Sequence, residues 1–304
     1  MKLTNKYDLP QTLINLYEKQ RDEYAETKGD ADVSVTQLIR SPRIDLLRKK
    51  HFAKIEEDIS DRLWAILGTV IHRIMEDGAD EEHIAEENLK TKVMGWTIKG
   101  GIDVVRKGNH VSILDYKFTK AYKYQKGDFL DWEEQMNLYA LLLRIVKDLY
   151  VDSLEVVVFV RDFSQGLVDQ QKNYPPASTV RVPIKLWTKE KQQAFLEKKI
   201  REHQDARRAY EWGEDLPLCT DRDRWLRPGT YVVRKKGSAR ATKVFEDDIK
   251  AAGDYKMSMK KPDDYEVYLR QKAPARCAGD WCGVAKWCDQ WAKDKDKWDE
   301  KSKN

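Results

Sequence analysis

Two carboxylates and a lysine stand close together in the first half of the chain and could share one reaction. Asp103 ends the phrase Gly-Gly-Ile-Asp, and Asp115 and Lys117 stand two positions apart in Leu-Asp-Tyr-Lys. Carboxylate oxygens are ligands that Mg²⁺ and Mn²⁺ prefer, and such ions activate water and offset charge on a phosphate. A lysine beside them can orient the water or stabilise the transition state. These residue types indicate phosphodiester hydrolysis, with a solvated strand face as the alternative, since Asp-x-Lys is common by chance.

Two strands must position these three residues. Residues 97–106 and 110–118 alternate in polarity and are predicted to pair as a β-hairpin around the polar link at 107–109. Successive side chains of a strand point to opposite faces of the sheet. Asp115 and Lys117 are therefore expected on one face.

The length of the link decides where the other carboxylate lies. A three-residue loop places Arg106 opposite His110 and brings Asp103 opposite Ile113, on the face of the other two residues. A two-residue loop would place Asp103 on the opposite face. The predicted chemistry depends on this register.

Two helical stretches carry further candidates. His72 stands four positions before Glu76, and Gln135 stands four positions before Tyr139, so each pair lies on one helix face. A single histidine in an apolar helix is more often a packed core residue than a ligand. The carboxylates downstream favour the ligand here, and Glu76 is a candidate to hold the ligands in place.

These pieces occur in a defined order along the chain, from Gly68-x-x-x-His72 to Gln135-x-x-x-Tyr139. The chain resembles the RecB-type branch of the PD-(D/E)xK nuclease superfamily, in particular its AddB and CRISPR-associated exonuclease-like members. Their motifs run G-x-x-x-H, G-x-x-D, (D/E)-x-K and Q-x-x-x-Y. The resemblance covers about residues 33–291. It implies metal ligands at His72, Asp103, Asp115 and the backbone carbonyl of Tyr116, and catalytic or supporting roles for Asp103, Asp115, Lys117, Gln135 and Tyr139.

The chain has four cysteines, and all lie in its last third. Cys277, Cys282 and Cys288 are closely spaced, and Cys219 stands apart from them. In an intracellular protein such clustered thiols indicate a metal site more than disulfides. Four thiolates suit Zn²⁺ or an iron–sulfur cluster, and the lack of a C-x2-C pair favours iron. Packed free cysteines are the alternative.

The resemblance also favours iron at the cysteines. It implies a [4Fe–4S] cluster held by a C-terminal cysteine triplet and one distant cysteine. In related nucleases the distant ligand often stands at the position of Ser41, so this chain departs from the pattern and offers Cys219 instead.

Two basic segments are candidates for contact with DNA. In the first, lysines alternate with aromatic residues, which suits phosphate contact combined with base stacking. In the second, a basic hairpin surrounds Gly237-Ser238 and would contact phosphates. The candidate DNA-binding residues are Lys117, Lys120, Tyr122, Lys123, Tyr124, Gln135, Tyr139, Arg234, Lys235, Lys236, Arg240 and Lys243.

The expected fold class is α/β, a restriction-endonuclease-like core in which helices flank a mixed central sheet. Apolar runs predict further strands at 154–161, buried on both faces, and at 179–186. A small ββαβ insertion and a cysteine-ligated module follow. The expected domains are 1–32, an N-terminal helical extension; 33–218, the nuclease core; 219–291, the cysteine-ligated module with its insertion at 226–272; and 292–304, a flexible tail.

Composition sets the outer limits. The chain of 304 residues has 36% charged residues and a net charge of +4, a mild excess that fits nucleic-acid contact without requiring it. No run approaches the roughly 18 apolar residues of a membrane helix. A protein of the cytoplasm is expected, in a prokaryote or a phage-infected host cell.

The expected function is a Mg²⁺- or Mn²⁺-dependent DNA exonuclease that favours single strands. It would act in recombination, repair or replication, with a helicase, recombinase or single-strand-binding protein as a possible partner. The preference for ends comes from the family resemblance alone. Two alternatives remain open, a catalytically inactive nucleic-acid-binding protein with a nuclease-like fold and a structure-specific endonuclease.

Overall fold

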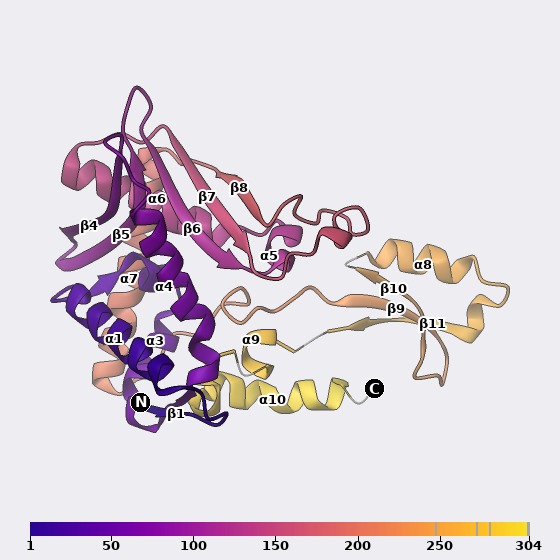
Figure 1. Ribbon diagram of the computed structural model, residues 1–304. Coiled ribbons are helices and arrows are strands. Elements are labelled where there is room, and N and C mark those ends of the chain that lie inside the picture. The colour runs from indigo at the N-terminus through magenta and orange to yellow at the C-terminus, as the bar shows by residue number, and fades with distance from the viewer. Residues whose placement is uncertain (247, 272, 280, 303–304) are drawn as a thin grey trace. The chain divides into compact units, whose positions relative to one another are not determined.

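A computed structural model describes residues 1–246, 248–271, 273–279 and 281–302 (Figure 1). The chain divides into two compact units. Unit 1 comprises Met1–Arg40 and Glu56–Arg208, and unit 2 comprises Ser41–Ile55 and Ala209–Asn304. Residues 1–32, the expected N-terminal helical extension, belong to unit 1, where β1 (Lys2–Thr4) pairs in parallel with β3 (Glu56–Asp58).

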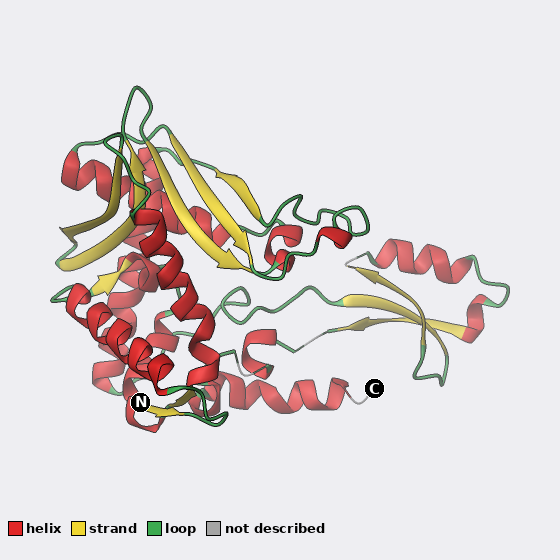
Figure 2. Ribbon diagram, in the orientation of Figure 1, coloured by secondary structure: helices red, strands yellow, loops and turns green. Residues whose placement is uncertain are grey.

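Unit 1 is built on a mixed six-stranded sheet flanked by helices, as the sequence predicts (Figure 2). The strand order is β2-β5-β6-β7-β8, and β4 also pairs with β5. The β6–β7 and β2–β5 pairs are parallel and the others are antiparallel. The strands are β2 (Val33–Ser34), β4 (His83–Val93), β5 (Trp96–Arg106), β6 (Ser112–Thr119), β7 (Ser153–Val160) and β8 (Thr179–Ile184).

The sheet forks along one edge of β5. β6 pairs with residues 104–106 of β5, and β2 pairs with residues 98–99. In the described ladder, residues 100–103 pair with neither strand on this edge. A fork of this kind leaves side chains and backbone groups at its opening free for other contacts. Asp103 lies at that opening.

The predicted register of the β5–β6 hairpin is wrong. Arg106 pairs with Ser112 and not with His110, so the link covers residues 107–111. A shift of two residues keeps every side chain on its predicted face, because the side-chain period of a strand is two. Asp103 therefore still lies on the same face as Asp115. Extending the observed register places Asp103 opposite Asp115, whereas the sequence analysis expected it opposite Ile113.

The sequence analysis missed strand β4. It forms a long antiparallel hairpin with β5 that closes through Met94 and Gly95, both with positive φ (50° and 82°). Two such residues form the tight turn whose twist matches paired strands. The charged stretch from Glu86 to Lys92 conceals the alternation that marks a strand.

Helix α6 forms the centre of the unit 1 core. Eleven of its eighteen residues are buried, and Met136, Leu138 and Leu142 are almost inaccessible. β7 buries alternate residues, and its other face is only half covered, so the strand is not buried on both faces as expected. The unit 1 helices are α1 (Gln11–Lys28), α2 (Val35–Leu38), α4 (Leu63–Glu76), α5 (Ala121–Lys126) and α6 (Leu130–Lys147). α7 (Lys189–Trp212) follows β8, and short 3-10 helices lie at Ile59–Arg62 and Gln165–Leu167.

Unit 2 contains a three-stranded antiparallel sheet in the order β10-β9-β11. Its chain order β9 (Thr230–Lys235), β10 (Ala241–Glu246), α8 (Ile249–Met257), β11 (Tyr265–Arg270) follows the expected ββαβ pattern. The remaining helices are α3 (Pro42–Lys50), α9 (Ala275–Ala278) and α10 (Asp289–Ser302), with 3-10 helices at Phe52–Lys54, Pro262–Asp264 and Ala285–Trp287.

The C-terminal segment expected to be a flexible tail is described as helical up to Ser302. Residues 292–302 continue helix α10, and residues 303–304 lie outside the described part. The segment contains neither glycine nor proline, and its lysines and glutamate are good helix formers. Elsewhere, no helix among the described residues is both long and apolar enough to cross a membrane.

Candidate active site and cysteine site

Asp103 is the centre of the candidate active site in unit 1. At the fork, its Oδ2 accepts a hydrogen bond of 2.7 Å from the backbone N–H of Tyr116. Its Oδ1 lies 3.2 Å from Nδ1 of His72, which reaches the sheet from helix α4. The Tyr116 ring meets His72 edge-on, with centroids 6.3 Å apart. The fork thus brings together two of the residues that the motifs single out and places Tyr116 against both.

Glu86 joins this pair and was not among the predicted ligands. Ligand atoms of His72, Glu86 and Asp103 all lie within 4.8 Å of one another. Glu86 lies opposite Asp103 in the β4–β5 register, at a position that the ladder skips, and its φ is +49°. The turn at Gly95 was a usable signal, because counting back from it pairs these two residues.

The charges at this cluster raise two pKa values. Burial raises the pKa of Glu86, and the neighbouring carboxylate of Asp103 adds to the effect. Burial alone would lower the pKa of His72, but its hydrogen bond to Asp103 and the carboxylate charges outweigh burial, and the pKa is raised. Carboxylates that crowd in this way are stabilised by a cation. The donor set of one imidazole and carboxylates suits a divalent metal ion.

A buried Asp115 and a half-buried Lys117 form an ion pair on β6. Lys117 Nζ lies 2.6 Å from Asp115 Oδ2, and Asp115 is 2% exposed. Burial raises the pKa of Asp115 to about 6 despite the lysine. Burial alone would lower the pKa of Lys117, but the Asp115 and Asp103 carboxylates outweigh it, so the ammonium is retained. In this position the Asp115 carboxylate and the Lys117 ammonium each stabilise the charge of the other.

Gln135 and Tyr139 lie together on α6. Gln135 Nε2 donates a hydrogen bond of 2.7 Å to the hydroxyl oxygen of Tyr139, and both side chains are buried. Burial and then the Asp115 carboxylate raise the pKa of Tyr139 to about 12, so the phenol stays protonated. The pair therefore provides a neutral polar surface beside Asp115 and Lys117.

The segment after β6 is only partly free to contact a ligand. Lys123 Nζ lies 2.7 Å from Asp131 and 5.2 Å from the Trp132 ring centroid. Tyr124 packs against the core and stacks obliquely on Phe129. Lys120 is exposed, and Tyr122 is 46% exposed. Lys123 and Tyr124, both expected to contact DNA, thus make internal contacts and are half-buried, while Lys120 and Tyr122 are more accessible.

An exposed aromatic surface lies on the same unit. Trp64 on α4 is 46% exposed, with the Arg161 guanidinium 4.5 Å from its ring centroid and the Phe118 ring 5.9 Å away. Phe118 directly follows Lys117 in β6. The arrangement combines a cation with accessible aromatic rings near β6.

The basic hairpin of unit 2 is also partly engaged. Arg234 Nε donates to Glu266 at 2.7 Å and the guanidinium lies over the Tyr268 ring. Lys243 Nζ lies between the Phe245 and Tyr255 rings. The side chains of the expected contacts that remain exposed are Lys235, Lys236, Arg240 and Lys243.

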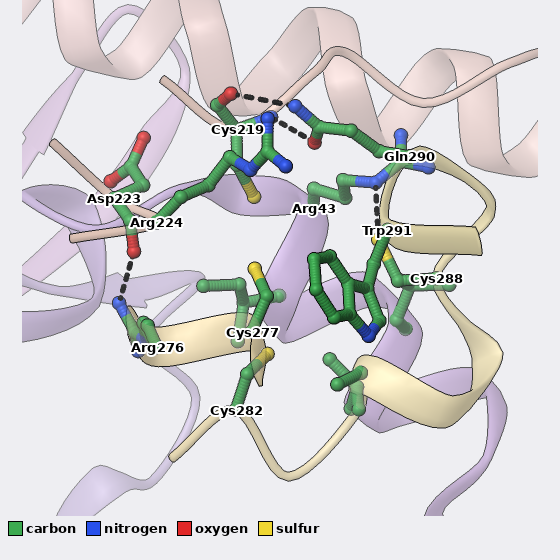
Figure 3. A pocket seen from close by; sticks show the side chains of 14 residues that line it. Arg43, Cys219, Asp223, Arg224, Arg276, Cys277, Cys282, Cys288, Gln290 and Trp291 are labelled. Atoms are coloured by element: carbon green, nitrogen blue, oxygen red, sulfur yellow. Dashed lines mark hydrogen bonds between the residues drawn. The ribbon is translucent and has the colours of Figure 1, made fainter. Parts of the chain in front are cut away.

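All four cysteines line one pocket of unit 2 (Figure 3). Cys277 lies in α9, Cys282 and Cys288 lie on either side of a 3-10 turn, and Cys219 comes from the loop before β9. Gln290 fixes that loop by hydrogen-bonding both backbone polar groups of Cys219. The Cys219 N–H donates to Gln290 Oε1 at 2.8 Å, and Gln290 Nε2 donates to the Cys219 carbonyl at 2.9 Å.

Hydrogen-bond donors surround the sulfur atoms. The Arg43 guanidinium, which is 1% exposed, donates to Cys288 Sγ at 3.4 Å. Burial raises the pKa of Cys277, and the Arg224 guanidinium that hydrogen-bonds it opposes this effect. Burial raises the pKa of Cys219 to about 11. Without a metal the thiols of Cys219 and Cys277 are protonated, because burial raises their pKa values. The hydrogen-bond donors would stabilise the thiolates that form when cysteines bind a metal.

No three of the four sulfur atoms all lie within 4.8 Å of one another. Among the described residues, only His72, Glu86 and Asp103 form a group of three or more potential ligands within 4.8 Å. Zn–S bonds of about 2.3 Å would bring four sulfurs to about 3.8 Å from one another. Some of the four sulfur atoms therefore lie further apart than the ligands of one bound zinc ion would.

Comparisons with known proteins show similarity to solved structures at low sequence identity. Neither the protein-family models nor the curated proteins contain a match to this chain. A solved structure titled "Crystal structure of SSO0001" is similar with a TM-score of 0.45 and 18% identity, over 63% of this chain and 86% of that one.

Proposed function

We propose that this protein is a metal-dependent DNA nuclease of the RecB-type PD-(D/E)xK family that degrades DNA from its ends. One observation carries the proposal. At the fork between β5 and β6, the ligand atoms of His72, Glu86 and Asp103 converge, beside the ion pair of the buried Asp115 and the half-buried Lys117. A binding module has no need to place a buried carboxylate and a lysine against a second carboxylate, because such charges are costly without a function.

His72, Asp103 and Asp115 would hold Mg²⁺ or Mn²⁺, with the Tyr116 carbonyl as the family resemblance implies and Glu86 as an additional ligand. The ion supplies a Lewis acid and an activated water. Lys117 holds its proton and orients the attacking water or offsets charge on the phosphate. Gln135 and Tyr139 position Lys117 from α6 and add no charge of their own.

Single-stranded DNA is the favoured substrate. Trp64 and Tyr122 expose rings next to cations, since Arg161 covers one ring and Lys126 lies 5.5 Å from the other. Unpaired bases stack on such rings, whereas a duplex hides its base faces. The family resemblance supplies three further parts of the proposal. They are the preference for DNA ends, a role in recombination, repair or replication, and a partner that is a helicase, recombinase or single-strand-binding protein.

The cysteine site is proposed to hold a [4Fe–4S] cluster, with Zn²⁺ as the alternative. The cluster is supported by the observation that no three of the sulfur atoms are all as close together as the ligands of one zinc ion. Cys219, Cys277, Cys282 and Cys288 would be the ligands, and Arg43 and Arg224 would offset their negative charge. Iron and zinc analysis of protein purified without oxygen distinguishes the two.

The nuclease proposal is tested with end-labelled linear DNA and closed circular DNA, each single- and double-stranded, with Mg²⁺ or Mn²⁺. Asp115→Ala is the test variant, and Asp169→Ala, at an exposed aspartate, is its matched control. We expect metal-dependent loss of linear DNA alone, abolished only by Asp115→Ala. Cleavage of circular single strands would favour the endonuclease. DNA binding without cleavage would favour the inactive binding protein.

A further inference from the structure

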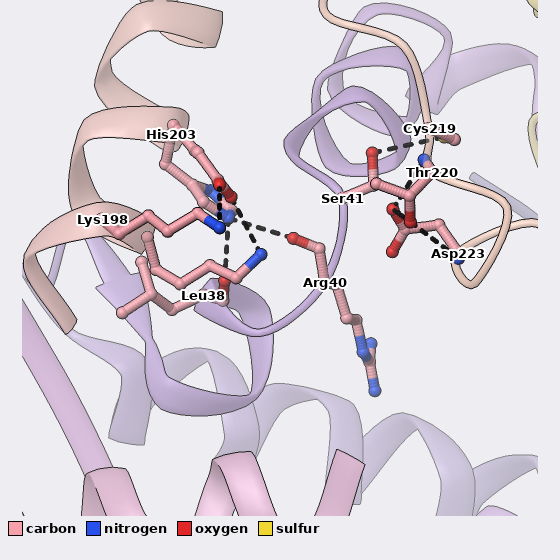
Figure 4. Close-up of polar contacts among 10 residues, drawn as sticks. Leu38, Arg40, Ser41, Lys198, His203, Cys219, Thr220 and Asp223 are labelled. Atoms are coloured by element: carbon pink, nitrogen blue, oxygen red, sulfur yellow. Dashed lines mark hydrogen bonds and ion pairs between the residues drawn. The ribbon is translucent and has the colours of Figure 1, made fainter. Parts of the chain in front are cut away.

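Ser41 and Cys219 lie side by side although 178 positions separate them. The Ser41 Oγ is 3.2 Å from the Cys219 Sγ (Figure 4). Ser41 is 5% exposed, so little water reaches the contact. Both residues belong to unit 2, where Cys219 lines the pocket of the other three cysteines.

The Ser41 hydroxyl does not form the hydrogen bond that is usual for a serine at the start of a helix. Ser41 is the N-cap of α3, with an extended backbone (φ −66°, ψ 124°), and Pro42 follows it. An N-cap serine ordinarily accepts a hydrogen bond from a backbone N–H of its own helix. Here the side chain makes no such bond, and it meets the sulfur instead.

Neighbouring residues hold both sides of this contact in place. Two residues after Ser41, Arg43 donates to the carbonyl oxygen of Leu216 at 2.7 Å, just before Cys219. The same guanidinium donates to Cys288 and pairs with Asp289. Gln290 bonds both backbone groups of Cys219. The start of α3 and the Cys219 loop are therefore fixed to each other and to the cysteine triplet.

We propose that Ser41 and Cys219 form one corner of the cysteine site, in which the Ser41 hydroxyl donates to the Cys219 thiolate and a thiolate at either position completes the ligand set. A thiolate that binds a metal has no proton, so the hydroxyl must be the donor. Serine and cysteine differ by one atom, so a sulfur at position 41 would stand at the same corner. The inference rests on the proposed metal centre at the cysteines, and not on the nuclease activity.

The first experiment exchanges the ligand between the two positions. Cys219→Ala removes the sulfur, the double variant Cys219→Ala/Ser41→Cys returns it from the other side, and Cys219→Ala/Ser258→Cys is the matched control, since Ser258 is exposed on α8's C-terminal cap. Full-length proteins are purified without oxygen and measured for bound iron, zinc and visible absorbance. We expect loss of the intact centre in Cys219→Ala, recovery to near wild-type metal content in the exchange variant, and no recovery in the control.

The second experiment tests the donor role of Ser41. Ser41→Ala should keep the centre but lower its midpoint potential, because hydrogen bonds to the sulfurs favour the reduced, more negative state. Ser41→Thr, which keeps the hydroxyl, should restore the wild-type potential. If the bound metal is zinc, the rate at which a chelator removes it is measured in place of the potential. Ser41→Ala should then lose the ion faster than the wild type.

Three results would overturn the inference. One is full metal content in Cys219→Ala. Another is an exchange variant that folds, by its circular dichroism and thermal melting, yet stays as poor in metal as the control. The third is a Ser41→Ala protein whose potential and metal retention match the wild type. A wild type that binds neither metal would end the cluster proposal itself, and DNA cleavage tests the nuclease proposal separately.

Discussion

Metal binding at the fork should weaken steeply in acid, because protons compete for two of the proposed ligands. Burial raises the pKa of Asp115 to about 6, and Asp103 holds the pKa of His72 above its usual 6.5. Both groups must lose their protons to bind an ion. Affinity should therefore fall as the pH drops through these values, in contrast to a site of ordinary carboxylates, which would stay ionised.

The expected size follows from the two pKa values. Between about pH 7 and about pH 5, protonation of Asp115 weakens affinity by ~10-fold. Protonation of His72 weakens the metal affinity by at least ~25-fold over the same range, because the pKa of His72 is no lower than the ordinary value for histidine. The combined loss is at least ~250-fold. Mn²⁺ titration calorimetry across this range, without DNA, measures it directly.

Variants assign the loss to residues. Asp115→Asn should bind more weakly at every pH and should lose the ~10-fold part of the pH dependence. His72→Gln should lose the larger part. His110→Gln is the matched control, since His110 is 87% exposed and lies away from the fork in the β5–β6 link. A wild-type affinity that changes less than ~10-fold, or an Asp115→Asn profile parallel to the wild type, would refute the reasoning.

Three further changes test the scaffold, each measured by urea unfolding and by cleavage of linear DNA. Gly68→Ala should stabilise the protein by up to ~1 kcal/mol, because Gly68 lies within α4 and its added Cβ meets nothing within 4 Å; lower activity in a stabilised variant would mean that the DNA approaches this turn. Gly100→Ala should destabilise it by ~1–3 kcal/mol, since the Cβ would lie 2.8 Å from Leu142 Cδ1. Ser34→Ala should cost ~1 kcal/mol, because it removes a complete capping box with Gln37, and activity per folded molecule should be unchanged.

Much of the fold could be predicted because local patterns specified it. The β5–β6 hairpin, β8, α7 and the ββαβ elements follow from alternation, helical periodicity and turn residues. The register error was harmless only because it was an even number of residues. A one-residue error would have placed Asp103 on the other face and removed the predicted site.

The rest depended on long-range pairing. Strand β4 is rich in charge, and its identity comes from its partner β5 more than from its own residues. Without β4, Glu86 could not be placed beside Asp103. Likewise, no spacing rule relates Ser41 to Cys219, since their contact depends on how α3 packs in unit 2.

The two candidate sites have opposite electrostatic designs, and this difference is the strongest reason to assign them different occupants. At the fork, Glu86, Asp103 and Asp115 gather negative charge against one imidazole and one ammonium, an arrangement that a cation stabilises. In the cysteine pocket, the guanidinium groups of Arg43 and Arg224 point at sulfur atoms. Such donors stabilise thiolates and the net negative charge of a thiolate-ligated centre. These charges support the proposals of a hydrolytic ion at the fork and of a sulfur-ligated structural or redox centre in unit 2.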